Sequence, residues 1–226
     1  MSTEYEASRL TALSALASSI RTERFMGTFA LEYEGAFDLG ALSRNALSPS
    51  ADLRFTAFEG FDIVAFGRRA YRIPTFNELY YVGYGNPQLA PEDAWLTDLG
   101  IDFNRRVNAA WTMKLKADVF YNLLKNKIIS APTEEDPNIW APYNIGKVRS
   151  LGLDLAAGFV WHDADWRCAF DARYTLLSAT DRTPDSYSYG QQIPYIAKHT
   201  VTASVKASWK GYELNPRWVL KSGRSD

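Results

Sequence analysis

The chain has 226 residues, of which 46% are hydrophobic and 14% aromatic, and its formal net charge is −1. A charge this close to zero gives no broad basic surface for nucleic acid. A single cysteine, Cys168, excludes an internal disulfide and a cysteine-based zinc cluster. The sequence contains no apolar run of about 18 residues, so it predicts no transmembrane helix. This test does not detect the strands of a membrane barrel, because their residues alternate between apolar and polar.

Alternation of apolar and polar residues predicts a succession of β-strands. Residues 5–18 alternate weakly and fit either a strand or a short helix, whereas from Phe25 to Phe37 apolar residues dominate every second position. The same period continues along the chain, and Glu59-Gly60 is a hairpin-turn signal. The further predicted strands are 50–58, 61–69, 94–104, 109–123, 147–161, 166–177, 197–209 and 212–221.

The predicted connections alternate in length along the chain. Short turns are expected at 19–23, 59–60, 105–108, 162–165 and 210–211, and long connections at 38–49, 70–93, 124–146 and 178–196. All short turns then lie at one end of the sheet, which is up-and-down antiparallel topology. Aromatic residues gather on the apolar strand faces near the short turns, as at the water–lipid interface of a membrane barrel. They are Phe25, Phe61, Phe103, Trp111, Trp161, Trp166, Trp209 and Tyr212.

A soluble β-sandwich also has alternating strands, but three features favour a membrane barrel. Several strands run to about 12 to 15 residues, which suits a tilted crossing of a bilayer. Polar faces that carry Lys116, Asp118 and Arg173 fit a polar lumen, as they would fit a solvated sheet face. The third feature is the difference in loop length between the two ends. We therefore predict an all-β, antiparallel up-and-down transmembrane β-barrel, partial, with about ten strands of a larger barrel.

The connection Tyr71–Glu92 differs in composition from an ordinary linker. Three prolines restrict its backbone, and Gly83 and Gly85 allow shapes that other residues resist. Four aromatic residues stand where a solvated loop is usually polar: Phe76, Tyr80, Tyr81 and Tyr84. A loop this long in a compact β protein is functional or disordered, and this composition argues against disorder.

Several segments carry a resemblance to a known family. They are RIPTFNELY from Arg72, GNPQLAPE from Gly85, DVFYN from Asp118, Asn126–Ile129, Asn144–Val148 and Gly152-x-Asp154. In this order they resemble the barrel domain of TonB-dependent outer-membrane receptors, over roughly residues 50–224. The run Gln192–Tyr195 before His199 is similar to cobalamin-type receptors, particularly those of Bacteroidetes-like bacteria.

The resemblance implies a barrel of about 22 strands in the bacterial outer membrane, plugged by an N-terminal domain and energised through TonB. We expect residues 1–226 to be a single partial barrel domain without the plug domain and the closing strands, since no signal peptide pattern opens the chain. The implied partners are the plug domain and TonB, outer-membrane lipid and a nutrient ligand. A cobalamin-like corrinoid is favoured and a siderophore is the alternative. Neither an enzyme activity nor a cofactor is expected.

Ligand capture is predicted at aromatic residues of the long loops, which could stack on a planar chelate. They are Tyr80, Tyr81, Tyr84, Trp140, Tyr143, Tyr187 and Tyr189. The alternative for each is packing between loops or a place in the outer interface belt. Arg72 and Glu78 fit an ion pair as well as a ligand contact, and Glu134–Asp136 fits a solvated loop better than a Ca²⁺ site. A porin-like or adhesin-like barrel and a soluble carbohydrate-binding domain are the competing hypotheses.

Overall fold

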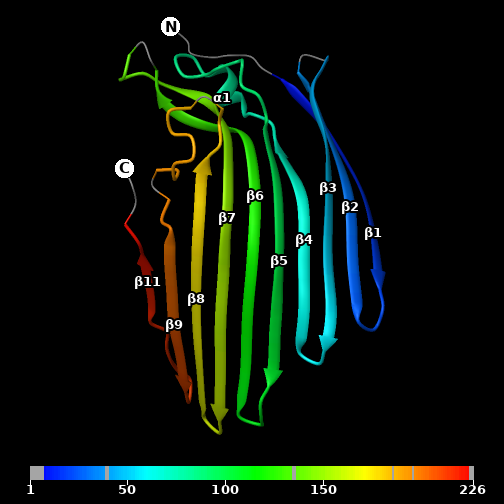
Figure 1. Ribbon diagram of the computed structural model, residues 1–226, viewed down its shortest axis with the longest axis vertical. Helices are drawn as coiled ribbons and strands as arrows, with labels where there is room; N and C mark the ends of the chain where they lie inside the picture. Colours follow the sequence, from blue (N-terminus) through cyan, green and yellow to red (C-terminus); the bar gives the residue numbers. More distant parts are fainter. Residues whose placement is uncertain (1–7, 39–40, 134–135, 185, 195, 224–226) are drawn as a thin grey trace.

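The computed structural model describes residues 8–38, 41–133, 136–184, 186–194 and 196–223, which form one antiparallel sheet of 11 strands. Successive strands from β1 to β9 are neighbours, and β10 and β11 both pair with β9 (Figure 1). The strands are β1 Arg9–Arg21, β2 Phe25–Asp38, β3 Ala41–Phe58, β4 Phe61–Arg72, β5 Glu92–Arg106, β6 Trp111–Pro132, β7 Trp140–Asp163, β8 Trp166–Asp181, β9 His199–Trp209, β10 Tyr212–Leu214 and β11 Arg217–Lys221.

The helix α1, Phe76–Tyr80, lies in the connection between β4 and β5. No helix in the described ranges is long and apolar enough to cross a membrane. The turns after β1, β3, β5, β7 and β9 lie together at one end of the sheet, and the connections after β2, β4, β6 and β8 lie at the other (Figure 1). The predicted up-and-down topology is therefore confirmed. The sequence left residues 5–18 open between a strand and a short helix, and residues 9–18 belong to the strand β1.

Two predicted long connections, 38–49 and 124–146, are wrong, because the strands run further than the sequence pattern does. Residues 41–49 pair with β2, with Ser48 opposite Glu32, and β6 and β7 stay paired from Lys127 to Pro132. Asn126 has a positive φ of 55° and is skipped in the pairing of β6 with β7. Pairing resumes at Lys127 opposite Ile145 in the same register. Strand ends beyond the membrane need not alternate between apolar and polar residues. The sequence pattern therefore ends before the strands do.

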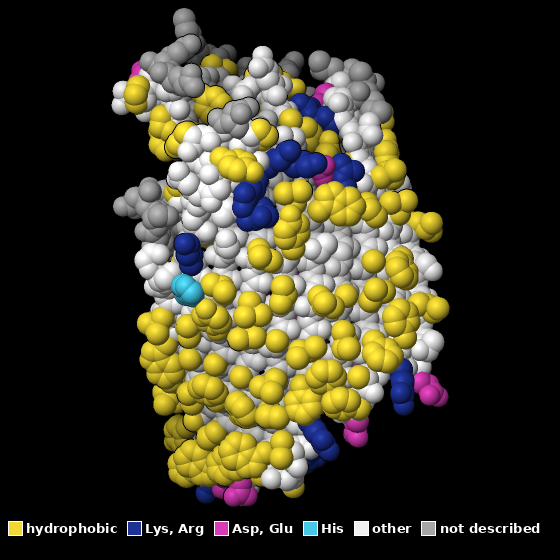
Figure 2. Space-filling view, viewed as in Figure 1, with side chains coloured by type: hydrophobic (Ala, Val, Ile, Leu, Met, Phe, Trp, Pro, Cys, Tyr) yellow, Lys and Arg dark blue, Asp and Glu magenta, His cyan; other side chains and the backbone are white. Residues whose placement is uncertain are grey.

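The sheet has one apolar face and one polar face. On the apolar face Leu99, Val119 and Leu151 are 61%, 52% and 47% exposed, and apolar side chains cover most of this face (Figure 2). On the polar face Lys116 pairs with Asp102 at 2.8 Å. A soluble sheet would bury its apolar side chains against a second layer. The described residues form a single sheet, and an apolar face as exposed as this one is typical of a sheet that contacts lipid.

The predicted aromatic row near the short turns is confirmed. Trp111 and Trp161 are directly opposite each other on β6 and β7, with ring centroids 6.4 Å apart. Trp209 lies between Trp166 and Tyr212, at 5.6 and 6.3 Å. Amphipathic rings at one level of a barrel are typical of the boundary between lipid and water. The row therefore places one membrane surface just inside the short turns.

Candidate functional site

The loop that joins β4 to β5, residues 73–91, is called the first long loop here and begins with α1. Thr75 caps the helix: its Oγ1 accepts a hydrogen bond from the Glu78 amide at 3.3 Å. In return the Thr75 amide donates to Glu78 Oε2 at 2.7 Å. This reciprocal capping box satisfies amides that a helix start leaves open. It orients α1 so that Leu79 points inward and is fully buried.

Arg72, at the end of β4, joins the helix to the sheet. Its Nε lies 2.7 Å from Glu92 Oε2 and its Nη1 lies 3.0 Å from Glu78 Oε2. Glu92 also accepts a hydrogen bond from the Ile128 amide at 2.8 Å. Burial opposes the charge of both carboxylates, but the hydrogen bonds from Arg72 keep the pKa of each below its usual value. Of the two roles open for Arg72 and Glu78, the structure shows the ion pair.

The first long loop covers a cluster of buried apolar residues. Leu79, Leu89 and Ile128 are 0%, 2% and 8% exposed, and Tyr80 packs against them. Gly85 lies so close to α1 that a Cβ atom at this position would come within 2.6 Å of the Tyr80 amide nitrogen. Only glycine allows that approach. The loop is therefore a packed element with a core of its own.

Asparagine side chains tie the first long loop to β6 and β7. Asn144 accepts from the Ala90 amide at 2.7 Å and donates to the Ala90 and Asn126 carbonyls at 2.9 and 2.8 Å. Asn86 donates to the Pro142 carbonyl at 3.0 Å. The ties to Ala90 and Pro142 cross 54 and 56 positions of the sequence. The motifs that contain Asn126 and Asn144 were visible in the sequence, but their role in holding this loop was not predicted.

The structure places two of the seven candidate aromatic residues inside this packed region. The Tyr80 ring lies 6.2 Å from the Phe76 ring and against the buried cluster. The Tyr84 hydroxyl is hydrogen-bonded to Ser130 Oγ on β6, and its ring meets that of Tyr81 edge-on at 6.5 Å. Tyr80 and Tyr84 thus stabilise the loop, whatever else they contact.

The other five aromatic candidates are open to solvent. Tyr81 is 50% exposed at the end of α1, and Trp140 and Tyr143, at the start of β7, are 53% and 36% exposed. Tyr187 and Tyr189, in the connection after β8, are 97% and 57% exposed. Both groups lie at the end of the sheet opposite the aromatic row. Their rings are therefore accessible to solvent at that end.

The connection from β8 to β9, residues 182–198, is called the second long loop and is organised by one carboxylate. Asp181 accepts hydrogen bonds from the hydroxyls of Ser186 and Ser188 at 2.7 and 2.6 Å and from the Thr183 amide at 2.7 Å. Burial opposes its charge, but these donors hold the pKa of Asp181 far below its usual value. This Asx-type arrangement shapes the described part of the loop through polar contacts.

The described residues bring together no group of three or more His, Cys, Asp or Glu side chains that could hold a metal ion. Glu134 and Glu135 of the predicted acidic run lie outside the described residues. Asp136 accepts a hydrogen bond from the Asn138 amide at 2.9 Å, which is a turn contact.

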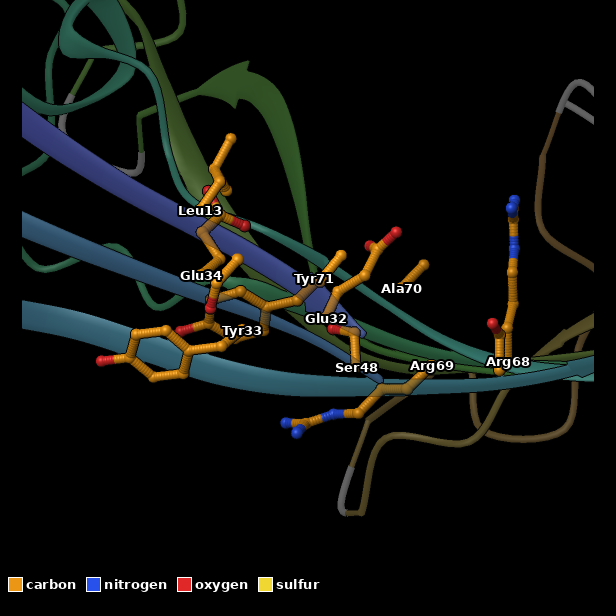
Figure 3. A pocket seen from close by; sticks show the side chains of 12 residues that line it. Leu13, Glu32, Tyr33, Glu34, Ser48, Arg68, Arg69, Ala70 and Tyr71 are labelled. Carbon is orange, nitrogen blue, oxygen red and sulfur yellow. The ribbon is translucent and has the colours of Figure 1, made fainter. Parts of the chain in front are cut away.

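A pocket of about 530 Å³ lies along β1 to β4 (Figure 3). Glu32 and Arg68 lie on one side of these strands, and Tyr33 and Arg69 on the other (Figure 3). The pocket therefore includes charged groups of the polar face and reaches an edge of the sheet. It holds no group of side chains arranged for catalysis.

An antiparallel sheet with an exposed apolar face, an aromatic row beside short turns and packed loops at the opposite end defines a wall of a transmembrane β-barrel. The chain belongs to the family of TonB dependent receptor-like β-barrels, which matches residues 9–226. Barrels of this family lie in the bacterial outer membrane and are transporters, not enzymes.

The sequence is similar to the Vitamin B12 transporter BtuB of Vibrio vulnificus, with 27% identity over 127 residues. That match covers 54% of this chain and 18% of the relative. Among solved structures, the siderophore receptor PirA of Pseudomonas aeruginosa has 22% identity and a TM-score of 0.63 over 95% of this chain and 38% of that one. PirA of Acinetobacter baumannii has 16% identity and a TM-score of 0.67 over 92% of this chain and 32% of that one. These structural likenesses support the fold.

Proposed function

We propose that the chain is part of the barrel wall of an outer-membrane receptor that takes up a large nutrient chelate by TonB-dependent transport. The family match over residues 9–226 carries this proposal. The chain spans 18% of the curated relatives and about a third of the solved structures it matches. The proposed receptor therefore includes further strands and a plug domain, with TonB as its energy-coupling partner. The alternative of a porin-like or adhesin-like barrel is disfavoured by the family.

We propose a cobalamin-like corrinoid as the ligand. The curated relatives are named vitamin B12 transporters, and their similarity extends to sequence, at 27% identity. The siderophore receptors among the solved structures share 22% identity or less, which supports a common fold only. The similarity to receptors of Bacteroidetes-like bacteria stays a prediction.

The exposed aromatic residues at the outer end are the proposed ligand contacts in this part of the receptor. Tyr81 lies just after α1, Trp140 and Tyr143 lie at the start of β7, and Tyr187 and Tyr189 lie in the connection after β8. Flat rings with polar tips suit a large ligand that has both apolar and polar surface. Tyr80 and Tyr84 are proposed to act through the shape of the first long loop, because they are packed into it.

The experiment is equilibrium binding of cyanocobalamin to the purified full-length receptor. Saturable binding at or below micromolar concentration is expected. Replacing Trp140, Tyr187 and Tyr189 with alanine should weaken binding about tenfold or more. The control is Tyr212→Ala, which removes a ring that is 75% exposed at the other end of the sheet. Absence of cyanocobalamin binding together with saturable binding of a ferric siderophore would overturn the corrinoid assignment and leave the receptor class standing.

A further inference from the structure

Four cations gather at the outer end of the apolar face, and we call Lys125, Lys147, Arg149 and Arg182 the cationic cluster. Lys125 and Lys147 are directly opposite each other on β6 and β7. Arg149 follows two positions along β7, so its side chain is on the same face. The Arg182 amide donates to the Lys147 carbonyl at 2.7 Å. Figure 2 shows Lys and Arg side chains gathered above the apolar surface, over the upper parts of β6 and β7.

The cationic cluster has no carboxylate partner among the described residues. Asp93 is opposite Lys125 in the sheet, but its two oxygens bind Arg69 at 2.8 and 3.0 Å. The Nε atoms of Arg149 and Arg182 are shielded from solvent and have no hydrogen-bond partner. A shielded, charged donor without an acceptor is costly. Like charges at this spacing also repel one another, so the cluster is suited to bind an anion.

Several cations of the polar face, unlike those of the cationic cluster, have a carboxylate partner within the sheet. Lys116 lies 2.8 Å from Asp102, and Arg54 lies 2.6 Å from Asp62. The positive charge of the cationic cluster is therefore not a general property of this chain, whose formal net charge is −1. The positive charge of the cationic cluster lies at the outer end of the apolar face.

The surface next to the cationic cluster is apolar. Leu151 follows Arg149 by two positions on the same face and is 47% exposed, and Tyr121 opposite it is 46% exposed. A free anion would use only the cations. A molecule with an anionic head and hydrocarbon chains would use the cations and the apolar surface together.

We propose that the cationic cluster binds the phosphate-bearing headgroup of an anionic lipid, whose acyl chains lie against Leu151 and Tyr121. The cluster is at the end opposite the aromatic row, so the lipid belongs to the leaflet next to the long loops. Arginine forms paired hydrogen bonds to phosphate, and lysine adds charge. The inference depends on the membrane position of the barrel and not on which nutrient the receptor binds.

The test uses the full-length receptor in detergent, mixed with diphosphoryl lipid A or with zwitterionic phosphatidylcholine, and measures retained lipid by native mass spectrometry. The wild-type receptor should retain the phosphorylated lipid about tenfold more than phosphatidylcholine. Replacing Lys125, Lys147, Arg149 and Arg182 with glutamine should abolish this preference. The double variant Arg149→Lys with Arg182→Lys keeps the charge and should retain most of it.

The matched control replaces Lys114, Lys221, Arg167 and Arg173 with glutamine, which removes two lysines and two arginines from the polar face. It should keep the preference for the phosphorylated lipid. Folding of each variant is checked by its resistance to unfolding in detergent without heating. Equal retention by the wild type and the folded cluster variant would overturn the proposal. So would full displacement of lipid A by inorganic phosphate, since that result would assign the cluster to a free anion.

Discussion

The two long loops lie at the same end of the sheet and are stabilised in different ways. The first long loop has a buried apolar cluster, an ion-pair centre at Arg72 and asparagine ties to β6 and β7. The second is shaped mainly by hydroxyl and amide donors around Asp181, and it carries the most exposed of the candidate rings, Tyr187. The first loop thus has the features of a fixed scaffold, and the second those of an adaptable contact surface.

The largest expected effect is on the core of the first long loop. Leu79→Ala leaves a cavity next to Leu89 and Ile128, so the free energy of opening this loop should fall by about 3 kcal/mol. Amide hydrogen exchange of residues 76–89 measures it. Leu176→Ala, on the apolar face and 38% exposed, is the matched control and should leave this exchange unchanged. Unaltered protection in Leu79→Ala would contradict the scaffold role.

Removing the charge centre should have the next largest effect. Arg72→Ala leaves Glu78 and Glu92 without their cation, and since Arg72 is partly exposed we expect a loss of about 2 kcal/mol in loop stability. The control is Arg68→Ala, four positions earlier on the same strand, with no ion pair described and an expected change below about 0.5 kcal/mol. Hydrogen exchange again gives the result. Equal effects of the two variants would remove Arg72 from the scaffold.

Acid should loosen the second long loop through Asp181. The folded-state pKa of Asp181 is lowered, so its contribution to stability is fully present above the unfolded value of about 3.9 and is lost as the pH falls below it. In Asp181→Asn this loss should already be present at neutral pH, at about 1 kcal/mol. Proteolysis within residues 182–198 measures the opening at each pH. An unchanged pH dependence in Asp181→Asn would show that another group controls the loop.

The smallest effect on stability is expected at Tyr187 of the second long loop, where the effect on ligand binding should be large. Tyr187→Ala removes a ring that is 97% exposed, so the stability of the second long loop should change by less than about 0.5 kcal/mol. Ligand affinity should nevertheless fall, as measured by equilibrium binding of cyanocobalamin. A loss of stability without loss of affinity would reverse the assignment and make Tyr187 a packing residue.

The sequence was sufficient to predict the parts of the fold that depend on period and position. Alternation along segments such as 109–123 predicted the strands, and Trp111 and Trp161 predicted the aromatic row. Alternation could not predict the strand ends, because β6 and β7 stay paired as far as Pro132 through residues that do not alternate between apolar and polar. The hydrogen bonds made by Asn144 could not be predicted from the sequence either, since they join residues up to 54 positions apart. The roles of Tyr80 and Tyr84 depend on the same distant contacts.

The asparagine ties of the first long loop have a consequence for the order of assembly. Asn86 and Pro142, joined by one of them, are 56 positions apart and meet only after β4, β5, β6 and β7 are in register. Contacts between distant residues form late, because the chain loses entropy before they are made. Closure of this loop therefore reports that four strands have been inserted correctly. A label on α1 that detects burial of Leu79 would distinguish a finished barrel wall from an intermediate with the same strand content.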